Sequence, residues 1–234
     1  MSLILNIDTS LGNAYVSLAE NGEPLLSSFN DNEKDHAAWI QPAIQKVMKE
    51  TGTTMHHLKA FGVCIGPGSY TGLRIGLSTA KGICYALNIP LIAEVSLRLI
   101  AFTAIKHMSA DSELPSPEFL FCPMIDARRM EVYTSLYNSN LYEVMKPTAL
   151  ILEQNSFKEE LRRQKILFLG NGSKKFQHVC QNNNAFFKKI PLEPFALTTL
   201  TYEKFIGNNF VDLAYTEPLY LKEFFTKNPN QNNL

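Results

Sequence analysis

Two aspartates in this chain follow short apolar runs, at positions where a carboxylate could do chemistry. Asp8 ends LILNID and is followed by Thr9 and Ser10, and Asp126 ends FLFCPMID. Carboxylates at the ends of two facing strands could act in acid catalysis or hold the metal ion of a bound nucleotide. The same side chains could simply accept hydrogen bonds from turn amides, as aspartate commonly does. Both interpretations stay open at this level.

A glycine-rich segment, GPGSYTGLRIGLSTAKG (66–82), holds five of the twelve glycines and follows the apolar run AFGVCI. It matches neither the GxxxxGK[ST] phosphate-binding loop nor the GxGxxG dinucleotide motif. We interpret the opening GPG as a turn into a helix. The unpaired amides of that turn could still hold an anion.

The predicted helix from Ser69 carries small residues at every fourth position, namely Gly72, Gly76, Ala80 and Cys84. Its three internal glycines together forfeit on the order of 3 kcal/mol relative to alanine. Close approach of another backbone would offset that loss through dispersion contacts. The stripe therefore predicts either a contact with a partner chain or burial inside this domain.

The histidines and cysteines show no spacing typical of a metal site. His56 and His57 are adjacent and would point apart on a helix, and the four cysteines contain no CxxC pair. We therefore expect no bound metal and reduced cysteines in the core. The start, MSLILNID, is not followed by a long apolar run, and no such run reaches about 18 residues. These features favour a cytoplasmic location without a membrane span.

Charge is balanced, with 22 basic and 22 acidic residues, and 45% of the chain is hydrophobic. The composition predicts a folded globular protein with an ample core. No overall field marks the chain as a binder of nucleic acid or membranes, so any role with tRNA is expected to be indirect.

The apolar pattern predicts a layout that recurs along the chain. A three-stranded meander, a helix over 35–50 that Pro42 interrupts, a strand and the glycine-rich helix precede a polar segment at 111–118. A second meander, helix, strand and helix follow it. We therefore predict two similar βββαβα half-domains of the α/β class. The first spans 1–110, the second 111–222 and a flexible tail 223–234, and a C-terminal helix near 197–215 could pack back on the first.

The glycine-rich segment, followed by a buried strand and EVSL, resembles the hallmark of the bacterial TsaB family, also called YeaZ. NIDTS, the helix that begins near His36, MIDARRMEVY and EPLYLK also fall where that family has counterparts. The resemblance runs from about residue 3 to 222, although 140–195 match only in outline. It implies an actin-like/Hsp70-like ATPase (ribonuclease H-like) fold and a part in making N6-threonylcarbamoyladenosine in tRNA.

The resemblance further implies a non-catalytic subunit that positions a related catalytic subunit, TsaD, in an assembly with the small ATPase TsaE. In that family the helices corresponding to 35–50 and 69–87 form the dimer surface. This implies partner contacts at Trp39, Ala43, Gly72, Leu73, Gly76, Leu77 and Ala80. The catalytic relative binds metal through two histidines four residues apart, whereas the corresponding segment here has only His107. No catalytic residue and no cofactor are therefore expected.

An independent ATPase or small-molecule kinase of the same fold is the alternative. It would use Asp8, Thr9, Ser10 and Asp126 around a magnesium nucleotide, and it predicts ATP binding by the isolated chain. A metal-dependent glycopeptidase is disfavoured because the paired histidines are missing. Whether the isolated chain is a monomer or a homodimer stays open.

Overall fold

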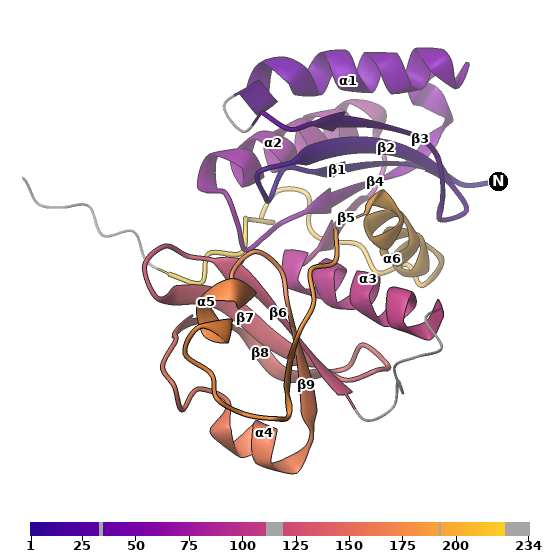
Figure 1. Cartoon of the computed structure of the whole chain (residues 1–234). Helices are drawn as coiled ribbons and strands as arrows, with labels where there is room; N and C mark the ends of the chain where they lie inside the picture. The colour runs from indigo at the N-terminus through magenta and orange to yellow at the C-terminus, as the bar shows by residue number, and fades with distance from the viewer. Residues whose placement is uncertain (33–34, 111–118, 192, 223–234) are drawn as a thin grey trace, which may run out of the picture.

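Two five-stranded sheets, each flanked by helices, form the body of the molecule (Figure 1). The computed structural model describes residues 1–32, 35–110, 119–191 and 193–222. The predicted tail at 223–234 and the boundary segment at 111–118 lie outside these residues. Within the described ranges, no helix combines the length and the hydropathy needed to cross a lipid bilayer.

The first sheet has the strand order β3-β2-β1-β4-β5. Strands β1 and β2 and strands β2 and β3 pair antiparallel, whereas β4 and β5 continue the sheet in parallel. The strands are β1 (Leu3–Asp8), β2 (Ala14–Glu20), β3 (Glu23–Asn30), β4 (Leu58–Cys64) and β5 (Leu91–Glu94). A short 3-10 helix, η2 (Met55–His57), precedes β4.

Helices α1 (His36–Glu50) and α2 (Tyr70–Leu87) cover one face of this sheet. Apolar residues of both helices pack on Leu5, Ile7 and Val63 of the sheet. Helix α1 runs without a break through Pro42. Pro42 has no N–H to donate to the carbonyl of Ala38, and both residues are exposed, so water can satisfy that carbonyl.

The second sheet repeats the strand arrangement of the first, with the order β10-β9-β6-β7-β8. Its strands are β6 (Phe119–Asp126), β7 (Glu131–Tyr137), β8 (Glu143–Ile151), β9 (Lys165–Leu169) and β10 (Ala185–Phe187). Helices α4 (Lys158–Arg163) and α5 (Ser173–Gln177) pack on its outer face through Leu161 and Phe176. Strand β10 has three residues, too few for an alternating pattern to predict it.

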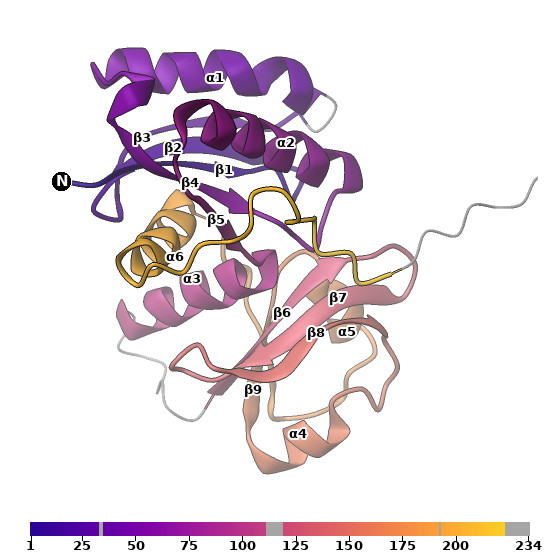
Figure 2. The same ribbon diagram turned by 180° about the vertical axis from the view of Figure 1, so that it is seen from behind.

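Helix α3 (Ser96–Ala110) lies between the two sheets and contributes to both cores. Leu97 and Ile100 pack against the second sheet, whereas Leu99 and Phe102 pack with Tyr15 of the first. Helix α6 (Pro194–Ile206) packs beside α3 on the first sheet, although it follows the second sheet in the chain (Figure 2). The division of the chain into two folding units at residue 110 stays a prediction.

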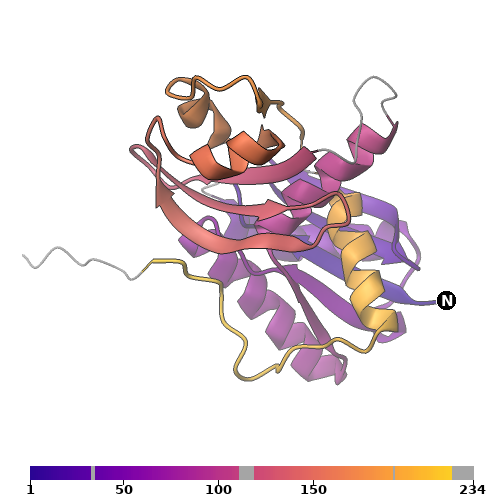
Figure 3. The same cartoon turned by 90° about the horizontal axis from the view of Figure 1, so that it is seen from below.

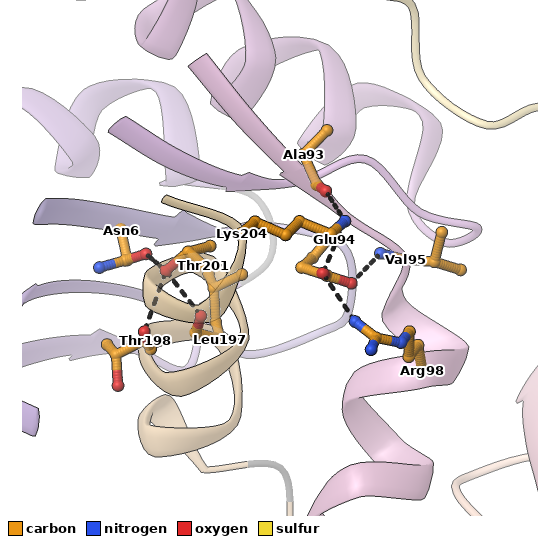
Figure 4. Close-up of polar contacts among 9 residues, drawn as sticks. All are labelled: Asn6, Ala93, Glu94, Val95, Arg98, Leu197, Thr198, Thr201 and Lys204. Atoms are coloured by element: carbon orange, nitrogen blue, oxygen red, sulfur yellow. Dashed lines mark hydrogen bonds and ion pairs between the residues drawn. The ribbon is translucent and has the colours of Figure 1, made fainter. Parts of the chain in front are cut away.

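Polar contacts fix α6 to the first sheet (Figure 4). Glu94, whose side chain is 1% exposed, lies 2.9 Å from Nη1 of Arg98 and 2.7 Å from Nζ of Lys204. Lys204 also donates to the carbonyl of Ala93 at 2.6 Å. Thr201 donates to Oδ1 of Asn6 at 2.7 Å. The end of β5, the start of α3 and the last turn of α6 are thereby joined by buried or half-buried polar groups.

Candidate functional site

The small-residue stripe of α2 packs against the end of β1 in the same chain. A Cβ atom on Gly72 would lie 2.1 Å from the carbonyl oxygen of Thr9, and one on Gly76 would lie 2.4 Å from Oγ1 of Thr9. The hydroxyl of Thr9 donates to the carbonyl of Gly72 at 2.7 Å. Only glycine allows this approach, and the contacts made there offset its cost within the helix.

The stripe is thus buried inside this chain, which is one of the two alternatives that its spacing left open. Of the seven expected contact residues, six are buried inside this chain, namely Ala43, Gly72, Leu73, Gly76, Leu77 and Ala80. Trp39 is the one that is partly exposed. The periodicity identified the small face of α2 correctly but did not reveal that β1 covers it.

The opposite side of α2 is exposed, together with the outward side of α1. We call this surface the outer face; it comprises Ala38, Pro42, Gln45, Thr71, Ser78, Gly82 and Tyr85. Tyr85 is 84% exposed, and a Cβ on Gly82 would meet no atom within 4 Å. None of these seven residues is charged, although Arg74 of α2 and Lys46 of α1 are exposed beside them. Gly82 thus differs from Gly72 and Gly76, because no contact within the chain offsets its cost to the helix.

A cleft of about 660 Å³ lies between the two sheets. It is lined by the glycine turn and the start of α2, by Ser10 to Gly12, by the turn after β6, and by residues 219–222. Of the four residues considered for a nucleotide contact, Ser10 and Asp126 line it. Asp8 and Thr9 do not, because both are buried beneath α2.

The buried position of Asp8 sets its chemistry. Its side chain is 1% exposed, and Oδ1 accepts a hydrogen bond from the Ser10 amide at 2.8 Å. Burial raises the pKa of Asp8, although hydrogen bonds from Ser10 act in the opposite direction. Burial also raises the pKa of the neighbouring Tyr15 and Cys64. Asp8 therefore accepts a hydrogen bond from a turn amide, which is one of the two roles that the sequence left open.

Asp126 is in a different environment, with a side chain that is 41% exposed. Its Oδ1 accepts hydrogen bonds from the Arg128 amide and from Nζ of Lys175, both at 2.6 Å. Partial burial alone would raise the pKa of Asp126, but these two donors outweigh it and leave the pKa lowered. The carboxylate is therefore charged and already engaged by this chain.

Residues 208–222, which we call the C-terminal strap, run from α6 along the first half (Figure 3), and residues 219–222 line the cleft. The amide of Val211 donates to the carbonyl of Leu91, and that of Leu219 donates to the carbonyl of Ile65, at 3.0 and 2.8 Å. Nε of Arg74 donates to the Tyr220 hydroxyl at 2.9 Å, and Lys222 forms an ion pair with Glu131 of the second half. The strap therefore bridges both walls of the cleft.

Two of the described histidines form side-chain contacts far from the adjacent pair His56 and His57. His107 is 2.9 Å from a carboxylate oxygen of Glu193, and Nδ1 of the buried His36 is 3.2 Å from the Asn30 amide nitrogen. Among residues 1–32, 35–110, 119–191 and 193–222, no three potential metal ligands of the His, Cys, Asp or Glu type come together.

Comparison with known proteins connects this architecture to one family. A family model described as "TsaD: tRNA N6-adenosine threonylcarbamoyltransferase" matches residues 30–215. The "tRNA threonylcarbamoyladenosine biosynthesis protein TsaB" of Bacillus subtilis is 30% identical over 171 residues, which cover 72% of this chain and 70% of the relative. The chain belongs to the TsaB (YeaZ) family. A TsaB protein of Haemophilus influenzae is 24% identical over 233 residues, covering 95% of this chain and 94% of that protein.

The solved structures agree on the fold. YeaZ from Pseudomonas aeruginosa superposes with a TM-score of 0.78 at 23% sequence identity, covering 94% of this chain and all of that one. The two mixed sheets therefore have the actin-like, ribonuclease H-like α/β fold of TsaB proteins, as the resemblance implied.

Proposed function

We propose that this chain is an accessory subunit in the biosynthesis of threonylcarbamoyladenosine in tRNA. In this proposal it binds a TsaD-like catalytic subunit through the outer face of α1 and α2 and performs no chemistry of its own. A TsaE-like ATPase completes the assembly, which works in the cytoplasm. The names of the TsaB relatives and the match to the TsaD family model support the process and the partner.

Gly82 is the residue that best supports the outer face as the partner-binding surface. A glycine inside a helix costs about 1 kcal/mol relative to alanine, and here no neighbouring atom of the chain requires it. The exposed residues on the same side of α2 include the small Thr71 and Ser78, the ring of Tyr85, and one charged side chain, that of Arg74. A surface with this composition suits the close approach of a second helix, in which Tyr85 would be an aromatic anchor.

The cleft supports an accessory role over an independent ATPase or kinase. Asp8 is buried and has a raised pKa, Asp126 is engaged by Lys175, and the strap lines the cleft that a nucleotide would enter. The residues expected to surround a magnesium nucleotide are thus either inaccessible or already bonded. ATP binding by the purified chain, measured by calorimetry, would favour the ATPase instead.

The test is co-purification with the TsaD-like relative, using variants at Gly82. We expect Gly82→Leu to abolish the complex while the isolated chain keeps its fold, because the added side chain projects away from the core. Gly82→Ala is the matched control and should retain most binding. Full recovery of the complex with Gly82→Leu would refute the outer face as the interface.

The accessory role has its own measurement, a tRNA modification assay with and without this chain. Full modification by the TsaD-like relative alone would refute the role itself. The isolated chain should self-associate through the same face, since an exposed uncharged surface without its partner commonly does so. Light scattering at rising concentration measures this, and Gly82→Leu should abolish it.

A further inference from the structure

Charge is distributed unevenly along the chain, although the whole sequence is neutral. Residues 119–191 contain eleven lysines and arginines but six aspartates and glutamates, a net charge of +5. Residues 1–110 contain eight of each kind. A local excess of this size on one half of a protein is the electrostatic feature expected of a surface that binds a polyanion.

Part of this excess surrounds the turn between β6 and β7. Arg128 and Arg129 form the turn, Lys174 and Lys175 lie on α5, and Lys222 reaches it from the strap. Three acidic residues, Asp126, Glu131 and Glu153, lie nearby. Asp126 pairs with Lys175, and Glu131 pairs with Lys222. Glu153 is placed near the turn because the amide of the preceding residue donates to the Met130 carbonyl. Five cations therefore face three carboxylates around the turn.

Three of these cations are available for a ligand. Arg128, Arg129 and Lys174 are exposed, and none forms an ion pair within the part of the chain that the structure describes. We call these three residues the basic turn. Asp126 lies beside the basic turn, where its Oδ1 accepts hydrogen bonds from the Arg128 amide and from Nζ of Lys175, both at 2.6 Å. The carboxylate nearest to the basic turn is thus already neutralised.

The backbone at the turn gives independent support. Arg128 and Arg129 have φ values of +69° and +45°, which is a left-handed backbone conformation. This conformation costs most residues conformational free energy, and the cost is smaller for Asn and Gly. A turn optimised for folding alone would favour those residues. Two arginines in this conformation indicate that their side chains serve a purpose beyond the turn.

The surroundings favour RNA over an acidic protein as the polyanion. Arg128 and Lys222 line the cleft, and Tyr70 and Tyr220 line it as well. The guanidinium of Arg74 stacks over the Tyr70 ring, 3.9 Å from its centroid. Cations beside a tyrosine–arginine stack are the combination with which proteins bind phosphates and unpaired bases of RNA.

We propose that the basic turn binds the phosphate backbone of the substrate tRNA. This rests on the proposed function, which puts the chain in a complex that modifies tRNA. The arginine forks suit phosphate oxygens, which they can contact with two parallel hydrogen bonds. The chain then contacts the tRNA directly, in contrast to the indirect role that its neutral net charge predicts.

The test measures tRNA binding by the complex with the TsaD-like subunit at a series of salt concentrations. The logarithm of the tRNA binding constant falls linearly with the logarithm of salt concentration, and each lost phosphate contact reduces the magnitude of this negative slope by roughly 1. Arg128→Gln/Arg129→Gln should therefore make the slope shallower by roughly 2. The matched control is Arg162→Gln/Arg163→Gln on α4, which removes the same charge from the same half. Equal effects of the two double variants would overturn the proposal.

Two further readouts separate this proposal from its alternatives. Loss of complex assembly with Arg128→Gln/Arg129→Gln, with tRNA affinity of the remaining complex unchanged, would identify an acidic protein partner instead. If Arg128→Gln/Arg129→Gln leaves both complex assembly and tRNA binding unchanged, the proposal that the basic turn binds tRNA is wrong, and the proposed accessory function is unaffected.

A second variant removes the charge while easing the backbone. Arg128→Asn/Arg129→Gly should keep or raise the thermal midpoint of the chain, because both residues tolerate positive φ. It should weaken tRNA binding as much as the glutamine pair does. Undiminished tRNA binding by this well-folded variant would overturn the proposal.

Discussion

Replacing Gly76 by alanine tests whether the stripe of α2 serves the core of this chain. A Cβ at this position would lie 2.4 Å from Oγ1 of Thr9 and 3.5 Å from the Cγ2 methyl of Ile7. The Thr9 hydroxyl cannot swing away freely, because it is buried and donates to the Gly72 carbonyl at 2.7 Å. Either Thr9 changes rotamer or α2 moves away from β1.

The magnitude follows from opposing effects. Alanine gains about 1 kcal/mol of helix propensity over glycine. Overpacking costs about 1–3 kcal/mol, and loss of the Thr9 hydrogen bond with a buried hydroxyl left unpaired costs about 1–3 kcal/mol more. We therefore expect Gly76→Ala to lower the free energy of unfolding by roughly 1–5 kcal/mol. Gly82→Ala, in open space, should raise it by up to about 1 kcal/mol.

Urea unfolding followed by circular dichroism measures both variants against the parent chain. A double variant sharpens the assay: Thr9→Ala removes the clashing oxygen, so Gly76→Ala should cost much less in a Thr9→Ala background than alone. If Gly76→Ala is as stable as the parent, or if Gly82→Ala is the more destabilising of the two, the assignment of the stripe to the core is wrong.

Two further predictions concern buried carboxylates. Glu94→Gln should lower the free energy of unfolding by about 2 kcal/mol. This is less than for a fully buried ion pair, because Arg98 and Lys204 are partly exposed. Urea unfolding of Glu94→Gln and of Arg98→Gln, each compared with the parent chain, measures the loss. Asp8 has a pKa raised in the folded state, so its contribution to stability is present below the unfolded pKa of about 3.9 and is lost as pH rises through the folded value. Asp8→Asn should therefore gain stability relative to the parent as pH increases from about 4, measured by unfolding at a series of pH values; a constant difference between the two proteins across that range would contradict the buried, raised pKa.

The sequence predicted the fold well where patterns are long. Both meanders and α2 follow from alternation and from helical spacing over many residues, whereas the three residues of β10 carry no such signal. The partner of the stripe could not be predicted, because small residues at every fourth position fit a strand of the same chain as well as a helix of another. Gly82 belongs to the same segment, and only its surroundings distinguish it.

The two aspartates illustrate the same limit. NIDTS and MIDAR look alike in the sequence, yet Asp8 is buried and Asp126 is exposed. The difference arises from α2 and the turn before it, whose glycines approach Thr9 and Ser10 closely, whereas Asp126 is exposed and bonded to Lys175 of α5. The charge excess of residues 119–191, in contrast, could be found by counting each half separately.

The return of α6 to the first sheet has a consequence for synthesis on the ribosome. Ile4, Ala60 and Ile92 on the lower face of that sheet are covered by Tyr202 and Phe205, and Thr201 bonds to a residue 195 positions earlier. The face of the first sheet that α6 covers therefore stays exposed to solvent until nearly the whole polypeptide has left the exit tunnel. A nascent chain that ends before residue 194 should be a client of chaperones, even though its second sheet is already complete.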